Sequence, residues 1–189
     1  VEFVNLEGYP ELFNDMEALF PQALGELGAP AFAGLAPTLE VRSVGAFVAS
    51  FVPSIADFKR LDRRFHLPSG VWGRIAQYRD YGFAVFQLKA GRLEVHPMAF
   101  RFPTRHPGTL FFPTVHLHDG TVHEETDFDH ALFAQAQEGL DWDGSKAPAG
   151  RGMATAGSAD GDRTAGLVRG DLQVYRKFLK GSLPNRDTL

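Results

Sequence analysis

The stretch "TLFFPTVHLHDGTVHEETDFDHALF", residues 109–133, carries the strongest local signal for the fold of this chain. Two runs in which apolar and polar residues largely alternate, as in half-buried strands, flank the dipeptide Asp119-Gly120. Asp-Gly is favoured in two-residue hairpin turns because both turn positions adopt positive φ. The stretch therefore predicts two antiparallel strands, over 109–118 and 121–133, joined by a tight turn.

Two further strand candidates precede this hairpin, "FAVFQLK" (83–89) and "RLEVHPMAFRF" (92–102). Their connections are short: Ala90-Gly91 lies between them, and "PTRHPG" (103–108) leads into the hairpin. Short connections with glycine and proline usually join antiparallel neighbours. The four candidates together predict an antiparallel β-meander.

Helical periodicity is confined to segments upstream of the meander. It occurs in "YPELFNDMEALF" (9–20), in 54–65 after the capping candidate Ser54, and in 69–81 before Gly82. The predicted fold class is therefore α+β: an antiparallel β-meander of about four to six strands, packed with two or three short N-terminal helices.

Three segments are compatible with two structures each. The segment 39–52 is either one strand or two short strands broken near Gly45. Residues 128–137 form either the end of a strand or a short helix, and the C-terminal part, 172–189, begins with a strand or a helix. Pattern alone does not separate short apolar helices from short strands.

The length of 189 residues favours a single domain over 1–189. Residues 141–164 are rich in glycine, alanine and serine, lack an apolar stripe, and indicate a flexible loop or insertion within that domain. Such a loop is either a plain surface insertion or a lid over an active site.

Composition excludes several classes of protein. A net charge of −4 argues against nucleic acid as a partner, because phosphate binding needs a basic face. The absence of cysteine excludes disulfides, zinc–thiolate sites and thiol nucleophiles. No apolar run reaches the roughly 20 residues that span a bilayer, so we expect no membrane partner.

We expect a bacterial, cytoplasmic protein, from the alanine, glycine and arginine bias and from the lack of a visible secretory signal. The chain starts at Val1, which is also compatible with a removed N-terminal leader. A homo-oligomer formed through the edge of the meander and a small-molecule ligand are both compatible with the sequence.

A two-residue turn at Asp119-Gly120 fixes which side chains share a face of the hairpin. His116 then lies opposite His123, and directly opposed residues point to the same side of a sheet. One face therefore carries His116, His118, His123 and Glu125. The other face carries Val115, Leu117, Val122 and Glu124.

Three imidazoles within one or two strand spacings of roughly 5 Å are suited to a Zn, Mn, Fe or Ni ion. In this hypothesis His116, His118 and His123 are the metal ligands, and Glu125 is a fourth ligand or the base that activates metal-bound water. His96 joins them only if a bulge near Pro97 or Pro113 reverses its register.

Two other interpretations of this face remain open: a solvated polar hairpin, and a metal-free acid–base site. We therefore expect a non-catalytic structural or ligand-binding domain, with a metal-dependent enzyme of hydrolase-like or oxygenase-like type as the alternative. Trp72, Tyr78, Arg79 and Tyr81 either line a ligand pocket or pack the core.

Overall fold

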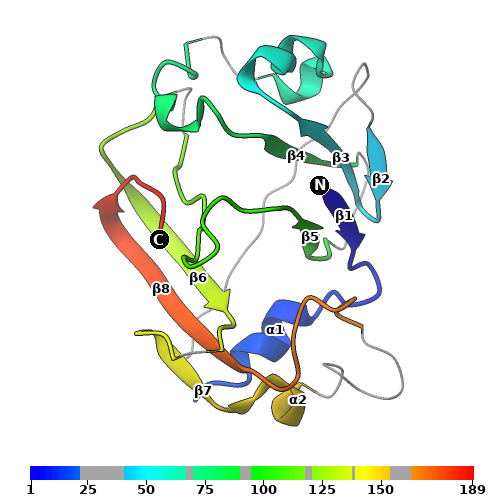
Figure 1. Ribbon diagram of the computed structural model, residues 1–189, viewed down its shortest axis with the longest axis vertical. Helices are drawn as coiled ribbons and strands as arrows, with labels where there is room; N and C mark the ends of the chain where they lie inside the picture. The colour runs from blue at the N-terminus through cyan, green and yellow to red at the C-terminus, as the bar shows by residue number, and fades with distance from the viewer. Residues whose placement is uncertain (22–40, 67–69, 90–94, 118–120, 138, 154–162) are drawn as a thin grey trace.

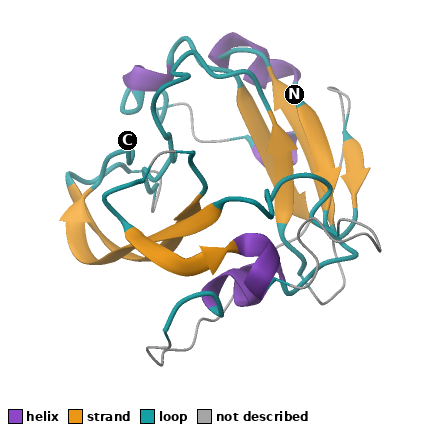
Figure 2. Ribbon diagram, turned by 60° about the horizontal axis from the view of Figure 1, so that its bottom comes forward, coloured by secondary structure: helices purple, strands orange, loops and turns teal. Residues whose placement is uncertain are grey.

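The computed structural model describes residues 1–21, 41–66, 70–89, 95–117, 121–137, 139–153 and 163–189. Within these ranges the chain forms eight strands in three antiparallel sheets, together with short helices (Figure 1). Figure 2 shows that strands make up most of the regular structure and that the helices are short pieces at the ends of the sheets. The chain is thus a mixed α+β structure with few helices.

The first sheet has the order β2 (Arg42–Val44), β3 (Phe47–Val52), β4 (Phe83–Leu88). A two-residue turn joins β2 to β3, and Gly45 takes a φ of +54° there. This conformation is strained for residues with a Cβ, which explains the glycine. The segment 39–52 therefore contains two short strands broken at Gly45, one of the two structures compatible with its sequence.

The second sheet packs on one face of the first through phenylalanine rings. It consists of β1 (Glu2–Asn5) and β5 (Met98–Arg101), in which Phe3 lies opposite Phe100. The ring of Phe86 on β4 lies 5.4 Å from Phe3 and 5.6 Å from Phe100, measured between ring centroids. Such edge-on and tilted contacts are the favourable arrangements for aromatic rings.

The opposite face of the first sheet is covered by short 3-10 helices, η1 (Ile55–Arg60), η2 (Arg63–Phe65) and η3 (Ala76–Tyr78). A buried cluster of Val52, Phe58 and Leu61 joins η1 to β3. Leu61 turns to an extended conformation with ψ 153°, which ends η1 after six residues, about two 3-10 turns. In place of the helices expected over 54–65 and 69–81, the structure has 3-10 segments of three to six residues.

The third sheet has the order β6 (Glu125–Ala134), β8 (Gln173–Pro184), β7 (Asp143–Pro148). The helices α1 (Leu12–Glu17) and α2 (Ala149–Gly152) contribute to the main core beside it. That core comprises Val4, Leu6, Tyr9, Leu12, Phe20, Ala149, Met153, Val168 and Val174. The stretch 141–164, expected to be a loop, therefore contains β7 and α2, while its residues 154–162 lie outside the described residues.

The single meander is not confirmed, because the strands found within its expected segments pair with strands elsewhere in the chain. β4 pairs with β3, β5 pairs with β1 from the N-terminal end, and β6 pairs with β8 over ten residues. Of the segment expected as a strand over 109–118, the described residues, 109–117, make one bridge, between Phe112 and Thr188. Among the described residues, no helix has the length and apolar character that crossing a membrane requires.

Candidate functional site

His116, the first residue of the predicted metal face, meets His130 of β6. The two Nε2 atoms lie 3.0 Å apart, and the ring of Phe128 stacks on His116 at a centroid distance of 4.6 Å. A hydrogen bond between two imidazole nitrogens needs one ring to donate its proton and the other to accept it. This contact fastens the extended segment 111–117 to β6, and the sequence left His130 without an assigned place.

The two arms of the expected hairpin are joined by the side chain of Asn185. Its Oδ1 accepts a hydrogen bond from the backbone N–H of His116 at 2.8 Å. Its Nδ2 donates to the carbonyl oxygens of His116 and His123, at 2.9 and 3.0 Å. A side chain from the C-terminal segment therefore bridges the two arms between His116 and His123.

The other described residues of the predicted face, His123 and Glu125, are exposed. His118 and the turn at Asp119-Gly120 lie outside the described residues.

His96 is held by hydrogen bonds to Pro97 and Ala46 instead of joining this cluster. It is buried, its Nδ1 donates to the carbonyl of Pro97 at 2.7 Å, and its Nε2 accepts from the N–H of Ala46 at 2.8 Å. The ring of Phe47 meets it edge-on at 5.2 Å. Both ring nitrogens are engaged, so His96 closes the turn between β2 and β3.

Within the part of the chain that the structure describes, no three histidine, aspartate or glutamate side chains are placed to share a metal ion. That set leaves out His118. A Zn, Mn, Fe or Ni centre at His116, His118 and His123, with Glu125 beside it, therefore stays a prediction.

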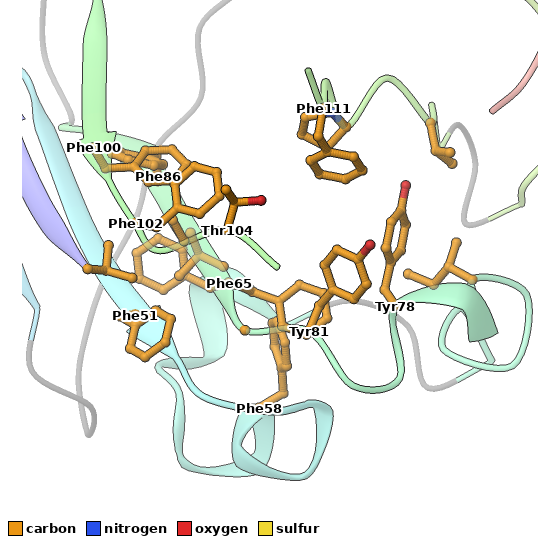
Figure 3. Close-up of a pocket in the computed structure, with 18 of the residues that line it drawn as sticks. Phe51, Phe58, Phe65, Tyr78, Tyr81, Phe86, Phe100, Phe102, Thr104 and Phe111 are labelled. Carbon is orange, nitrogen blue, oxygen red and sulfur yellow. The ribbon is translucent and has the colours of Figure 1, made fainter. Parts of the chain in front are cut away.

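A cavity of about 860 Å³ lies between the first sheet and the segment 111–117. This volume is in the range of small-molecule sites, roughly 300–1,000 Å³. Figure 3 shows aromatic rings around it, from β4, β5 and the 3-10 region. Eight phenylalanines line it: Phe51, Phe58, Phe65, Phe83, Phe86, Phe100, Phe102 and Phe111.

The segment 111–117 forms the wall opposite β4 with every second residue. Phe111, Pro113, Val115 and Leu117 line the cavity. The residues between them face the other way: Phe112 bridges Thr188, Thr114 donates from Oγ1 to the carbonyl of Arg186 at 2.9 Å, and His116 meets His130. Side chains of an extended chain point alternately to opposite sides. The histidine contact and the cavity wall are thus the two sides of one segment.

Two tyrosine hydroxyls lie at one end of the cavity. Figure 3 shows the hydroxyls of Tyr78 and Tyr81 on the side of Phe111, whereas the hydroxyl of Thr104 lies nearer Phe86. Arg105 lies next to Tyr81, with its guanidinium carbon 4.8 Å from the centre of the Tyr81 ring. Cations over an aromatic face are attracted by the ring quadrupole.

Tyr78 is tied to the C-terminal segment, since its hydroxyl donates to Oδ1 of Asp187 at 2.5 Å. Burial and this hydrogen bond to a carboxylate raise the pKa of Tyr78 well above its usual value. The phenol therefore stays protonated and holds the wall of the cavity in place.

The sequence pointed to part of this site. Trp72, Tyr78 and Tyr81 were candidates for a ligand pocket and do line the cavity, whereas Arg79 is not among its lining residues. The residues on β4 and β5, together with Thr104 and Arg105, were missed as site residues. Their only signal in the sequence was the high count of phenylalanine, 17 of 189 residues.

Comparison with known proteins identifies no relative of this chain. No protein-family model, no curated protein and no solved structure matches it. The cavity and its polar end are therefore the features from which a function can be argued.

Proposed function

We propose that this chain is a non-catalytic ligand-binding domain whose ligand is a small apolar molecule held in the aromatic cavity. The observation that carries the proposal is the lining, in which eight phenylalanines surround about 860 Å³. Burial of apolar surface is the main favourable term in binding such molecules.

Three of the phenylalanines that line the cavity support this function, because their apolar rings are partly exposed to water. Phe51, Phe100 and Phe102 are 39%, 37% and 52% exposed, respectively. A ligand that covers these rings removes apolar surface from water, at roughly 25 cal/mol per Å².

Titration with 2-naphthalenemethanol, a neutral aromatic molecule, tests the proposal. Calorimetry gives the affinity, and quenching of tryptophan fluorescence locates the binding. Trp72 lines the cavity, and Trp142 packs against Phe112 on the other side of segment 111–117, so a Trp142→Phe background reports on the cavity alone. We expect saturable binding with one ligand per chain and a change in Trp72 emission.

Phe102→Ala and Phe13→Ala form a matched pair of variants. Both rings are about half exposed, at 52% and 53%, and each lies beside another phenylalanine ring, at 5.5 and 6.3 Å. Only Phe102 lines the cavity. We expect Phe102→Ala to weaken binding about five- to tenfold, the equivalent of roughly 1 kcal/mol, and Phe13→Ala to leave it unchanged. Equal effects of the two variants, or no binding to the unmodified protein, would overturn the proposal.

A further inference from the structure

We propose that the ligand of the aromatic cavity carries an anionic acceptor group, of the carboxylate class, at the end formed by Tyr81 and Arg105. This inference rests on the proposed function and names the chemical class of its ligand: an amphiphile with a flat apolar body and a negatively charged head.

The charged residues that line the cavity favour an anionic ligand. The chain carries 23 acidic and 19 basic residues, a net charge of −4. The described residues that line the cavity nevertheless include no aspartate and no glutamate, whereas they include Arg105 and two histidines, His66 and His106. An anion placed in this cavity meets a guanidinium and no lining carboxylate, which is the complementarity that selects anionic ligands.

The hydrogen-bond donors at this end of the cavity also favour an acceptor such as a carboxylate. The Tyr81 hydroxyl has no hydrogen-bond partner among the described residues, and Figure 3 shows it at the polar end of the cavity. The guanidinium of Arg105 lies over the same ring, with its carbon 4.8 Å from the ring centre. A phenolic O–H next to guanidinium N–H groups suits an acceptor with several lone pairs, such as a carboxylate.

Arg105 is held in position before any ligand arrives. Its Nη1 donates to Oδ2 of Asp80 at 2.5 Å and its Nη2 to the backbone carbonyl of Asp80 at 2.7 Å, while its plane lies over Tyr81. Asp80 itself is not among the lining residues. A guanidinium has five N–H groups, so two bonds to Asp80 leave others for a second acceptor. A fixed guanidinium loses little conformational entropy when it binds an anion.

The arrangement of the two ends gives the shape of the ligand. In Figure 3 the rings of Phe51, Phe86, Phe100 and Phe102 stand together on one side, and the hydroxyl of Tyr81 lies on the other side near Phe111. An apolar body against the phenylalanine wall therefore places its head group at the donors. Flat aromatic bodies fit rings that offer both faces and edges.

The experiment compares three naphthalenes that differ only in the head group: 2-naphthoate, 2-naphthalenemethanol and 2-naphthylmethylammonium. Calorimetric titration of the full chain at neutral pH gives the three affinities. We expect 2-naphthoate to bind at least tenfold more tightly than the alcohol and the ammonium compound to bind most weakly, because charge-assisted hydrogen bonds are the strong ones.

Arg105→Gln and Arg169→Gln are the matched variants. Both arginines are about half exposed, and each pairs with a nearby exposed aspartate, Asp80 or Asp171. Arg169 does not line the cavity. We expect Arg105→Gln to remove most of the preference for naphthoate over the alcohol and Arg169→Gln to retain it. Tyr81→Phe, which removes the hydroxyl and keeps the ring, gives a second and independent reduction of the preference.

The outcomes separate this inference from the function on which it rests. If the three compounds bind with equal affinity, the cavity binds apolar molecules but the anionic head is wrong. If none of them binds, both the ligand-binding function and the anionic head group are refuted. A preference for naphthoate that is the same in Arg105→Gln and in the unmodified protein also overturns the inference, because the anion then binds elsewhere.

Discussion

The substitution Gly45→Ala tests how the turn between β2 and β3 is built. Gly45 has a φ of +54°, and a Cβ placed on it lies 2.0 Å from Nε2 of His96 and 2.8 Å from Oδ1 of Asn5. His96 is only 5% exposed and is held through both ring nitrogens, by Ala46 and Pro97. The imidazole has no room to retreat without breaking these hydrogen bonds.

The expected loss of stability has two parts. A left-handed φ costs an alanine about 1 kcal/mol relative to glycine. Displacement of His96 removes the hydrogen bond between its Nε2 and the N–H of Ala46, and leaving such groups unsatisfied costs about 1–3 kcal/mol. We therefore expect Gly45→Ala to lower the free energy of unfolding by about 2–4 kcal/mol.

Gly181→Ala is the matched control, because Gly181 has a φ of +80° and no atom lies within 4 Å of its built Cβ. Only the backbone part of the loss applies there. Urea denaturation followed by tryptophan fluorescence measures both variants, with the double variant Gly45→Ala/His96→Ala as a third sample. In the His96→Ala background the loss from Gly45→Ala should fall to that of Gly181→Ala. A Gly45→Ala variant no less stable than Gly181→Ala would refute the reasoning.

The remaining predictions concern the surroundings of the cavity and the histidines. Because the pKa of Tyr78 is raised on folding, the stability that its phenol adds is fully present below pH of about 10 and is lost progressively as the pH rises toward the folded-state pKa; in urea denaturation, the difference in stability between the protein and Tyr78→Phe should therefore be constant below pH of about 10 and begin to shrink above it. Asn185→Ala removes three hydrogen bonds to His116 and His123 and should destabilise by about 2–3 kcal/mol, while Asn185→Asp, which keeps the acceptor for the His116 N–H but sets a carboxylate oxygen against two carbonyl oxygens, should destabilise at least as much in the same assay. The metal hypothesis predicts that Zn²⁺, Mn²⁺, Fe²⁺ or Ni²⁺ raises the melting temperature and that His118→Ala abolishes the rise; protein purified without nickel, metal-free by elemental analysis and unchanged in melting temperature, would contradict it.

Two of the strands were predictable because their signals are local. The expected strand 83–89 is β4, Phe83–Leu88, and the expected strand 121–133 overlaps β6, Glu125–Ala134. Alternation and β-branched or aromatic residues depend only on neighbouring positions. In place of the helix expected over 69–81 the structure has the shorter η3, because glycine at positions 70 and 73 weakens a helix.

Strand partners were not predictable, because they depend on contacts that no local signal encodes. Short connections suggested that successive strands pair, yet β6 pairs with β8, about fifty residues later in the chain. The same limit applies to the cavity: Phe51, Phe86 and Phe100 lie on three strands of two sheets, and only the fold brings their rings together.

The alternation of side chains along the segment 111–117 does not depend on pairing with another strand. The sequence placed Val115 and Leu117 on one face and His116 on the other, and the structure retains this division although the segment makes only a single bridge, at Phe112. Alternation belongs to an extended backbone itself, whereas register belongs to a pair of strands. The hairpin prediction therefore identified which face of the segment carries histidine and which carries apolar residues, but not what each face meets. Long-range pairing of β6 supplies His130 to the first face, and packing of the 3-10 region and β4 supplies the aromatic cavity to the second.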